Sequence, residues 1–180
     1  MVNSRRKNIV ILIDCWDYTN SDNKNSVAAQ QTNISQNLRQ KMCQNICDFI
    51  SNNTIDLIVD ATHEYEIHPL LFDVIQRKNF IAIEKLKDFE HYVFEKYDSV
   101  NLYYTGLYWN MCVKDREIGW KNINNYVNLK NLDYRILFKE GTTLASENEG
   151  LECWPDFDND FFTLSHKISE TTWELIREKQ

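Results

Sequence analysis

The sequence predicts one α/β domain over residues 1–180, a three-layer α/β/α arrangement with a mainly parallel, Rossmann-like sheet of five to six strands. The first supporting observation is a continuous β-branched run over residues 8–14, which is typical of a strand buried on both faces. The second is that further strand-like runs alternate with segments of helical spacing, as in parallel sheets with helical crossovers. The third is an ordinary globular composition, 43% hydrophobic and 26% charged.

The first half of the chain alternates between strand and helix patterns. Apolar residues at 34, 38, 42, 46, 49 and 50 recur with helical spacing, after a polar loop over 19–33. Pro69 suits the first turn of a helix, and Asp88 suits the residue that caps one. We therefore predict strands over 8–14, 55–60 and 80–85, and helices over 34–50, 69–77 and 89–97.

The second half continues this alternation, although its patterns are shorter. A fourth strand should end just before Gly106, and a helix should start near Asn110 and run through Trp120. The asparagine-rich stretch 122–131 resembles a loop insertion. We predict a fifth strand over 134–138, a sixth over 161–164 and a terminal helix from about Ser169.

Charge and hydropathy narrow the classes of function. The formal net charge of −7 argues against a nucleic-acid partner, because such binding depends on Lys and Arg that neutralise phosphates. No apolar run approaches the ~20 residues of a membrane span. The basic run at 5–7 is interpreted as a solvated terminus. The five cysteines lack zinc spacing, so we expect thiols in the cytoplasm.

Three reactive side chains fall at or just after the ends of predicted strands. Asp14 follows the first strand, Lys85 ends the third, and Cys112 comes soon after the fourth. Sites in open parallel sheets form beyond the carboxyl ends of strands, so these side chains are expected to converge. Each also has a purely structural interpretation: an Asp that caps a loop, a solvated Lys and a buried Cys.

The segment around Cys112 resembles the isochorismatase-like cysteine-hydrolase superfamily, which includes isochorismatases and nicotinamidases. In Gly-Leu-Tyr-Trp-Asn-Met-Cys-Val, the glycine, asparagine and Cys-Val pair (106, 110, 112 and 113) stand where that family has them. The strand ending in Asp14-Cys-Trp-Asp matches the family's catalytic aspartate, and Lys85 matches its lysine. The resemblance covers roughly residues 8–140.

The resemblance implies a hydrolase that attacks a small molecule, with an amide-like C–N bond as the expected target, as a homo-oligomer without a cofactor. Cys112 would be the nucleophile and Asp14 the general base. Lys85 would lower the pKa of the thiol, helped by the helix N-terminus. Lys87 is an alternative to Lys85, because the segment between this lysine and Cys112 is shorter than in the family.

Four aromatic residues are candidates for substrate binding. Tyr108 and Trp109 replace small residues of the family's turn, so they line the pocket or pack against a neighbouring subunit. Trp16 and Tyr18 directly follow Asp14, so they line the same pocket or cover the end of the sheet.

Three alternatives remain open for the function of the chain. His63, Glu64 and His68 could bind zinc, but their spacing does not match the family's metal site, so we expect no metal. A catalytically silent homologue that acts as a binding or interaction protein is the second alternative. The third, an unrelated nucleotide-binding domain, is disfavoured because no glycine-rich loop follows the first strand.

Overall fold

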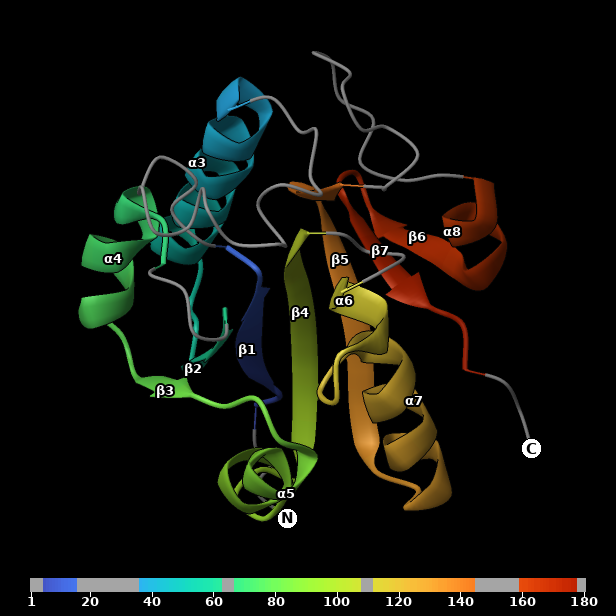
Figure 1. Ribbon diagram of the computed structural model, residues 1–180. Helices are drawn as coiled ribbons and strands as arrows, with labels where there is room; N and C mark the ends of the chain where they lie inside the picture. The colour runs from blue at the N-terminus through green and yellow to red at the C-terminus, as the bar shows by residue number, and fades with distance from the viewer. Residues whose placement is uncertain (1–4, 16–35, 63–66, 108–111, 145–158, 178–180) are drawn as a thin grey trace.

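The computed structural model describes residues 5–15, 36–62, 67–107, 112–144 and 159–177, and its core is one seven-stranded sheet (Figure 1). In spatial order the strands are β3 (Phe80–Ala82), β2 (Leu57–Ala61), β1 (Lys7–Ile13), β4 (Ser99–Leu107), β5 (Asp133–Leu144), β7 (Thr172–Leu175) and β6 (Ser165–Ser169). The first five are parallel to one another, and β7 and β6 are antiparallel additions at one edge. The α/β class with a mainly parallel sheet is therefore confirmed, with seven strands instead of five or six.

Strand β1 lies at the centre of the parallel part and pairs with β2 and β4. Its apolar residues from Ile9 to Ile13 are fully buried, as expected for a strand covered on both faces. Ile13 is level with Ala61 of β2 and with Gly106 of β4. The carboxyl ends of three neighbouring strands therefore meet at Asp14.

Two apolar cores lie on opposite faces of the sheet. Ile9 and Ile11 of β1 belong to one core and Val10 and Leu12 to the other, because side chains alternate along a strand. The second core contains residues of α3 (Gln36–Asn52) and α4 (Pro69–Gln76). The first contains residues of α5 (Leu86–Phe89), the π-helix η1 (Glu90–Phe94), α6 (Cys112–Asp115) and α7 (Trp120–Leu129). Each large apolar side chain buried this way contributes about 1.5–3 kcal/mol.

The region around Lys85 differs from the sequence-based expectation. Strand β3 ends at Ala82, and the following helix begins at Leu86 instead of Phe89. Asp88 lies inside α5, while Lys85 occupies the N-cap position without a side-chain cap. The N–H of Leu86 donates to the Glu117 carboxylate at 2.9 Å, so a distant residue serves as the cap. A tertiary contact of this kind leaves no local sequence signal.

The asparagine-rich stretch is not a loop insertion. It forms α7, in which Ile123 and Val127 are buried one helical turn apart while the asparagines between them are not. The helix predicted from Asn110 to Trp120 is only α6 among the described residues, and a turn leads from it to α7. Ile118 in that turn and Trp120 at the start of α7 are both buried.

The C-terminal elements have the opposite type from those predicted. Residues 159–164 form α8 (Asn159–Leu164), and the segment from Ser165 to Leu175 forms the β6–β7 hairpin. Phe161 packs edge-on against Phe138 of β5 and near Trp173 of β7. Antiparallel pairing of β7 with β5 supplies the backbone hydrogen bonds that override the local helical pattern.

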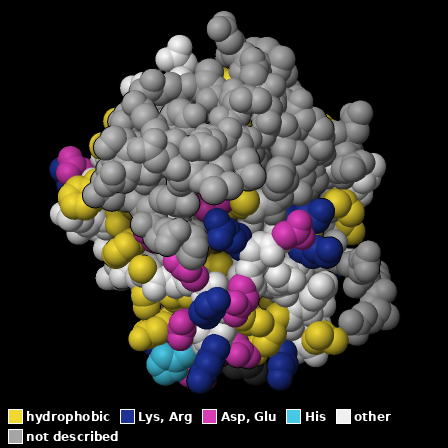
Figure 2. Space-filling view, viewed as in Figure 1, with side chains coloured by type: hydrophobic (Ala, Val, Ile, Leu, Met, Phe, Trp, Pro, Cys, Tyr) yellow, Lys and Arg dark blue, Asp and Glu magenta, His cyan; other side chains and the backbone are white. Residues whose placement is uncertain are grey.

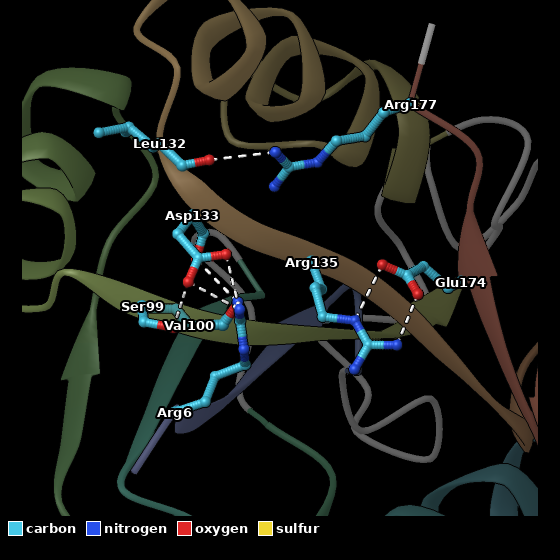
Figure 3. A network of polar contacts seen from close by, with 8 residues as sticks. All are labelled: Arg6, Ser99, Val100, Leu132, Asp133, Arg135, Glu174 and Arg177. Atoms are coloured by element: carbon cyan, nitrogen blue, oxygen red, sulfur yellow. Dashed lines mark hydrogen bonds and ion pairs between the residues drawn. The ribbon is translucent and has the colours of Figure 1, made fainter. Parts of the chain in front are cut away.

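Polar contacts hold the N-terminal end of β1 and the hairpin to the rest of the sheet (Figure 3). Arg6 Nη2 donates to both carboxylate oxygens of Asp133 at 2.6 and 2.7 Å. Arg135 forms a forked pair with Glu174, in which Nε and Nη2 donate at 2.9 and 2.5 Å. Arg5 and Lys7 both pair with Asp56. The basic run is thus bound to acidic residues instead of being freely solvated. Among the described residues, no helix has the length and apolarity to cross a membrane.

Candidate active site

Asp14 stands at the junction of β1 and β4. Its side chain is 9% exposed and its φ is +53°, a left-handed conformation that is uncommon for residues other than glycine. Opposite, Gly106 has φ +103°, and a Cβ there would lie 1.8 Å from the carbonyl oxygen of Ile13. Only glycine allows the two strand ends to approach this closely.

Cys112 opens α6 and lies half-buried against Asp14. The Asp14 carboxylate and the Arg116 guanidinium both interact with its thiol and shift its pKa in opposite directions. Arg116 Nη2 also donates to Asp14 Oδ1 at 2.8 Å. Residues four apart share one side of a helical turn, and the bond from Arg116 N–H to the Cys112 carbonyl continues that turn. The three side chains therefore form one closed cluster.

The environment of Cys112 raises the pKa of its thiol to about 12. Burial is the largest cause, followed by the negative charge of Asp14 and the hydrogen bond to it, while Arg116 opposes both. The sequence had suggested a lowered pKa. The difference arises because burial of the thiol and the neighbouring Asp14 carboxylate together outweigh the Arg116 cation. At neutral pH the thiol keeps its proton and offers it to Asp14.

Lys85 is placed differently from the expectation. Its side chain is 68% exposed, and Nζ lies 3.3 Å from Glu117 Oε2. The alternative, Lys87, lines a cavity of about 690 Å³ along η1 and α7, whose described lining includes neither Asp14 nor Cys112. The structure brings together Asp14 and Cys112, and the cation between them is Arg116. The spacing of four residues from Cys112 to Arg116 is the signal that could have identified it.

Several predicted residues lie outside the part of the chain that the structure describes. These are the aromatic residues Trp16, Tyr18, Tyr108 and Trp109 and two of the three zinc candidates, His63 and Glu64. The third, His68, caps α4, where its Nδ1 accepts the N–H of Leu70 at 3.3 Å. Within the described ranges, no group of three or more His, Cys, Asp or Glu side chains is arranged to hold a metal ion.

Comparison with known proteins adds no family assignment. No protein-family model, curated protein or solved structure matches the chain. The site consists of a protonated thiol, a buried carboxylate and a guanidinium at the carboxyl ends of parallel strands.

Proposed function

We propose that this protein is a cysteine-dependent hydrolase that acts on a small molecule, most directly on an amide-like C–N bond. The observation that carries the proposal is that Asp14 and Arg116, joined at 2.8 Å, both interact with the Cys112 thiol. A nucleophile held by its base, which is held in turn by a third group, is the usual arrangement for covalent catalysis. Arg116 takes the role that the sequence had suggested for Lys85.

The proposed reaction has two stages. Cys112 transfers its proton to Asp14 as sulfur attacks the carbonyl carbon, and the C–N bond breaks while Asp14 returns the proton to the leaving nitrogen. Water then attacks the resulting thioester, Asp14 accepts a proton from it, and the C–S bond breaks with return of the proton to sulfur. Arg116 keeps Asp14 oriented and compensates the negative charge on sulfur. A raised thiol pKa suits a proton transfer coupled to attack.

We also propose the layer arrangement of the fold, the location of the protein in the cell and its partners. The two cores support the three-layer, Rossmann-like arrangement. The four described cysteines are thiols, which supports a location in the reducing cytoplasm. We also propose a homo-oligomer that uses no cofactor and has no nucleic-acid or membrane partner. The acidic net charge of −7 supports the exclusion of nucleic acid.

A catalytically silent binding protein is the second candidate, and one observation favours it. Arg116 occupies one oxygen of Asp14, and the pKa of Cys112 is raised to about 12, so the resting thiol is a weak nucleophile.

A measurement of ammonia release from a panel of small carboxamides distinguishes the hydrolase from the silent binding protein. Cys112→Ser should abolish turnover, and Asp14→Asn should lower it about 100-fold or more, the usual contribution of a positioned base. Cys47→Ser is the matched control, because this thiol donates to the Leu70 carbonyl away from the site. Turnover that survives in Cys112→Ser would contradict Cys112 as the nucleophile, and absence of turnover across the panel would favour the silent binding protein.

A further inference from the structure

A cavity separate from the Asp14–Cys112 cluster lies between α7 and the β6–β7 hairpin. Its volume is about 520 Å³, within the range of small-molecule sites. Its described lining contains neither Asp14 nor Cys112. Lys114 of α6 does line it, and residues two apart do not share a face of a helical turn, so Lys114 and Cys112 serve opposite sides of α6. A ligand in this cavity would therefore be distinct from the substrate of the hydrolase reaction.

The polar wall of this cavity is cationic. Lys114 and Lys121 line it, and its described lining contains no acidic residue, in contrast to a chain with 27 acidic and 20 basic residues. Lys121 lies 4.0 Å from Asp115, whereas Lys114 forms no ion pair within the described part of the chain. Basic, acidic and apolar side chains gather on the right of the face in Figure 2, over the region where α6 and α7 approach the hairpin. A ligand anion would therefore meet a net positive wall.

Two asparagines of α7 add hydrogen-bond donors to the same wall. Asn124 and Asn128 follow Lys121 at helical spacing, so the three side chains form one stripe along the cavity. Both asparagines are half-buried, and their side-chain amides form no hydrogen bond to any described residue. Ammonium and amide N–H groups are donors that a carboxylate accepts. The stripe thus matches a carboxylate in both charge and hydrogen bonding.

The wall on the side of the hairpin is apolar. Leu164 of α8 and Ile176 after β7 are 43% and 50% exposed. They lie side by side, because the N–H of Ile176 donates to the Leu164 carbonyl at 2.8 Å. Leu175 and Trp120, which are buried, add further apolar surface to the cavity. An apolar group bound there would remove Leu164 and Ile176 from water, which is favourable in proportion to the area buried.

We infer that this cavity binds an amphiphilic carboxylate, a molecule with one carboxylate group and an apolar chain. The carboxylate lies against Lys114 and the asparagines of α7, and the chain lies against Leu164 and Ile176. A cationic ligand would meet two ammonium groups and no carboxylate in the described lining. A purely apolar ligand would displace water from Lys114 without replacing its hydrogen bonds.

Octanoate, octylammonium and 1-octanol test the inference, because they share an apolar chain and differ in charge. Calorimetric or NMR titration of the full wild-type chain measures their affinities. Octanoate should bind at least about tenfold more tightly than octylammonium, since like charges are costly at close range. Across butyrate, hexanoate and octanoate, the affinity should rise about two- to fourfold for each added methylene, because the chain is buried against the apolar wall.

Two variants locate the binding. Lys114→Met should weaken octanoate about three- to tenfold and leave 1-octanol within about twofold, because it removes only the charge interaction. Ile176→Ser should weaken octanoate more than butyrate, because it removes exposed apolar surface. The matched controls are Lys130→Met and Leu129→Ser, at exposed positions of α7 outside the described lining, and they should change neither affinity.

Three outcomes would overturn the inference. They are octylammonium that binds as tightly as octanoate, an octanoate affinity that Lys114→Met and Ile176→Ser both leave unchanged, and no measurable binding of octanoate. None of these measurements depends on turnover, so failure of the hydrolase proposal and failure of this inference are distinguishable.

Discussion

Arg116 binds a base and a nucleophile through one guanidinium. Its Nη2 contacts Asp14 at 2.8 Å, and the same group contacts the Cys112 sulfur. A planar guanidinium can serve both partners at fixed geometry, whereas a lysine ammonium is a single point charge. The identity of the cation therefore determines how Asp14 is aimed, which is why an exposed lysine is a poor substitute in this site.

The pKa of the Cys112 thiol provides a first test of the contact between Cys112 and Asp14. Asp14 raises the pKa of the thiol through its charge and its hydrogen bond, so Asp14→Asn should lower that pKa from about 12. Alkylation of Cys112 at pH 8 should become about tenfold faster for each unit of pKa lost. Peptide mass spectrometry after limited labelling measures this rate. Asp60→Asn is the control, and a Cys112 rate that is equal in wild type and Asp14→Asn would contradict the described contact.

Gly106 provides a second test, directed at the junction that positions Asp14. Gly106→Ala forces a Cβ to within 1.8 Å of the Ile13 carbonyl oxygen at a φ of +103°. The strand ends must then separate, so we expect a loss of more than about 2 kcal/mol in unfolding free energy. Urea denaturation measures the loss. Wild-type stability in the variant would show that β1 and β4 do not approach this closely.

At the scale of elements, the β6–β7 hairpin depends on its link to β5. Arg135 and Glu174 form a forked ion pair across the β5–β7 junction, with the Glu174 side chain 16% exposed (Figure 3). The hydrogen bonds from Arg135 are the main cause of the lowered pKa of Glu174, outweighing its burial. This pair is expected to fix the register of the hairpin, because charge-assisted forked bonds are directional.

The pH dependence of stability tests that pair. Because the folded pKa of Glu174 is depressed below its ordinary value of 4.5, its contribution is present above pH 4.5 and lost as pH falls through the folded pKa. Glu174→Gln should therefore lower the unfolding free energy at pH 7 by about 1–2 kcal/mol. The deficit should disappear in denaturation curves near pH 3. Glu170→Gln on the same hairpin is the control, and a deficit that is independent of pH would contradict the ion pair.

Sequence patterns predicted the helices and strands whose own residues form the core. They missed those that depend on contacts with residues far away in the sequence. The run at 8–14 and the spacing of Leu38, Met42 and Ile46 identify β1 and α3 directly, because their own residues form the core. The start of α5 depends on Glu117, and the hairpin depends on pairing with β5, so neither has a local pattern. The same reason applies to the site. The ends of the predicted strands point to Asp14 and Cys112, whereas Arg116 contacts them through the folded turn that begins at Cys112.

At the scale of the whole molecule, the sheet order explains why the site lies where it does. Strand β1 stands between β2 and β4, so Asp14 lies next to the carboxyl ends of both neighbours. The Cys112 thiol, which follows β4, then lies beside Asp14 and Arg116. A parallel sheet produces this convergence, since the carboxyl ends of its strands open on one edge.

The central claim is that Cys112 forms a covalent intermediate with Asp14 as its base, and acyl transfer from 4-nitrophenyl acetate tests it most directly. Wild type should release a burst of nitrophenolate equal to the enzyme concentration, and acid quenching should leave an acetyl group on the Cys112 peptide. Cys112→Ser should lose the burst and Cys47→Ser should keep it. In Asp14→Asn the burst should remain, while the steady release that follows it should slow about 100-fold or more, because Asp14 activates the water that hydrolyses the thioester. Acetylation spread equally over Cys47 and Cys112, or a burst that persists in Cys112→Ser, would contradict the account.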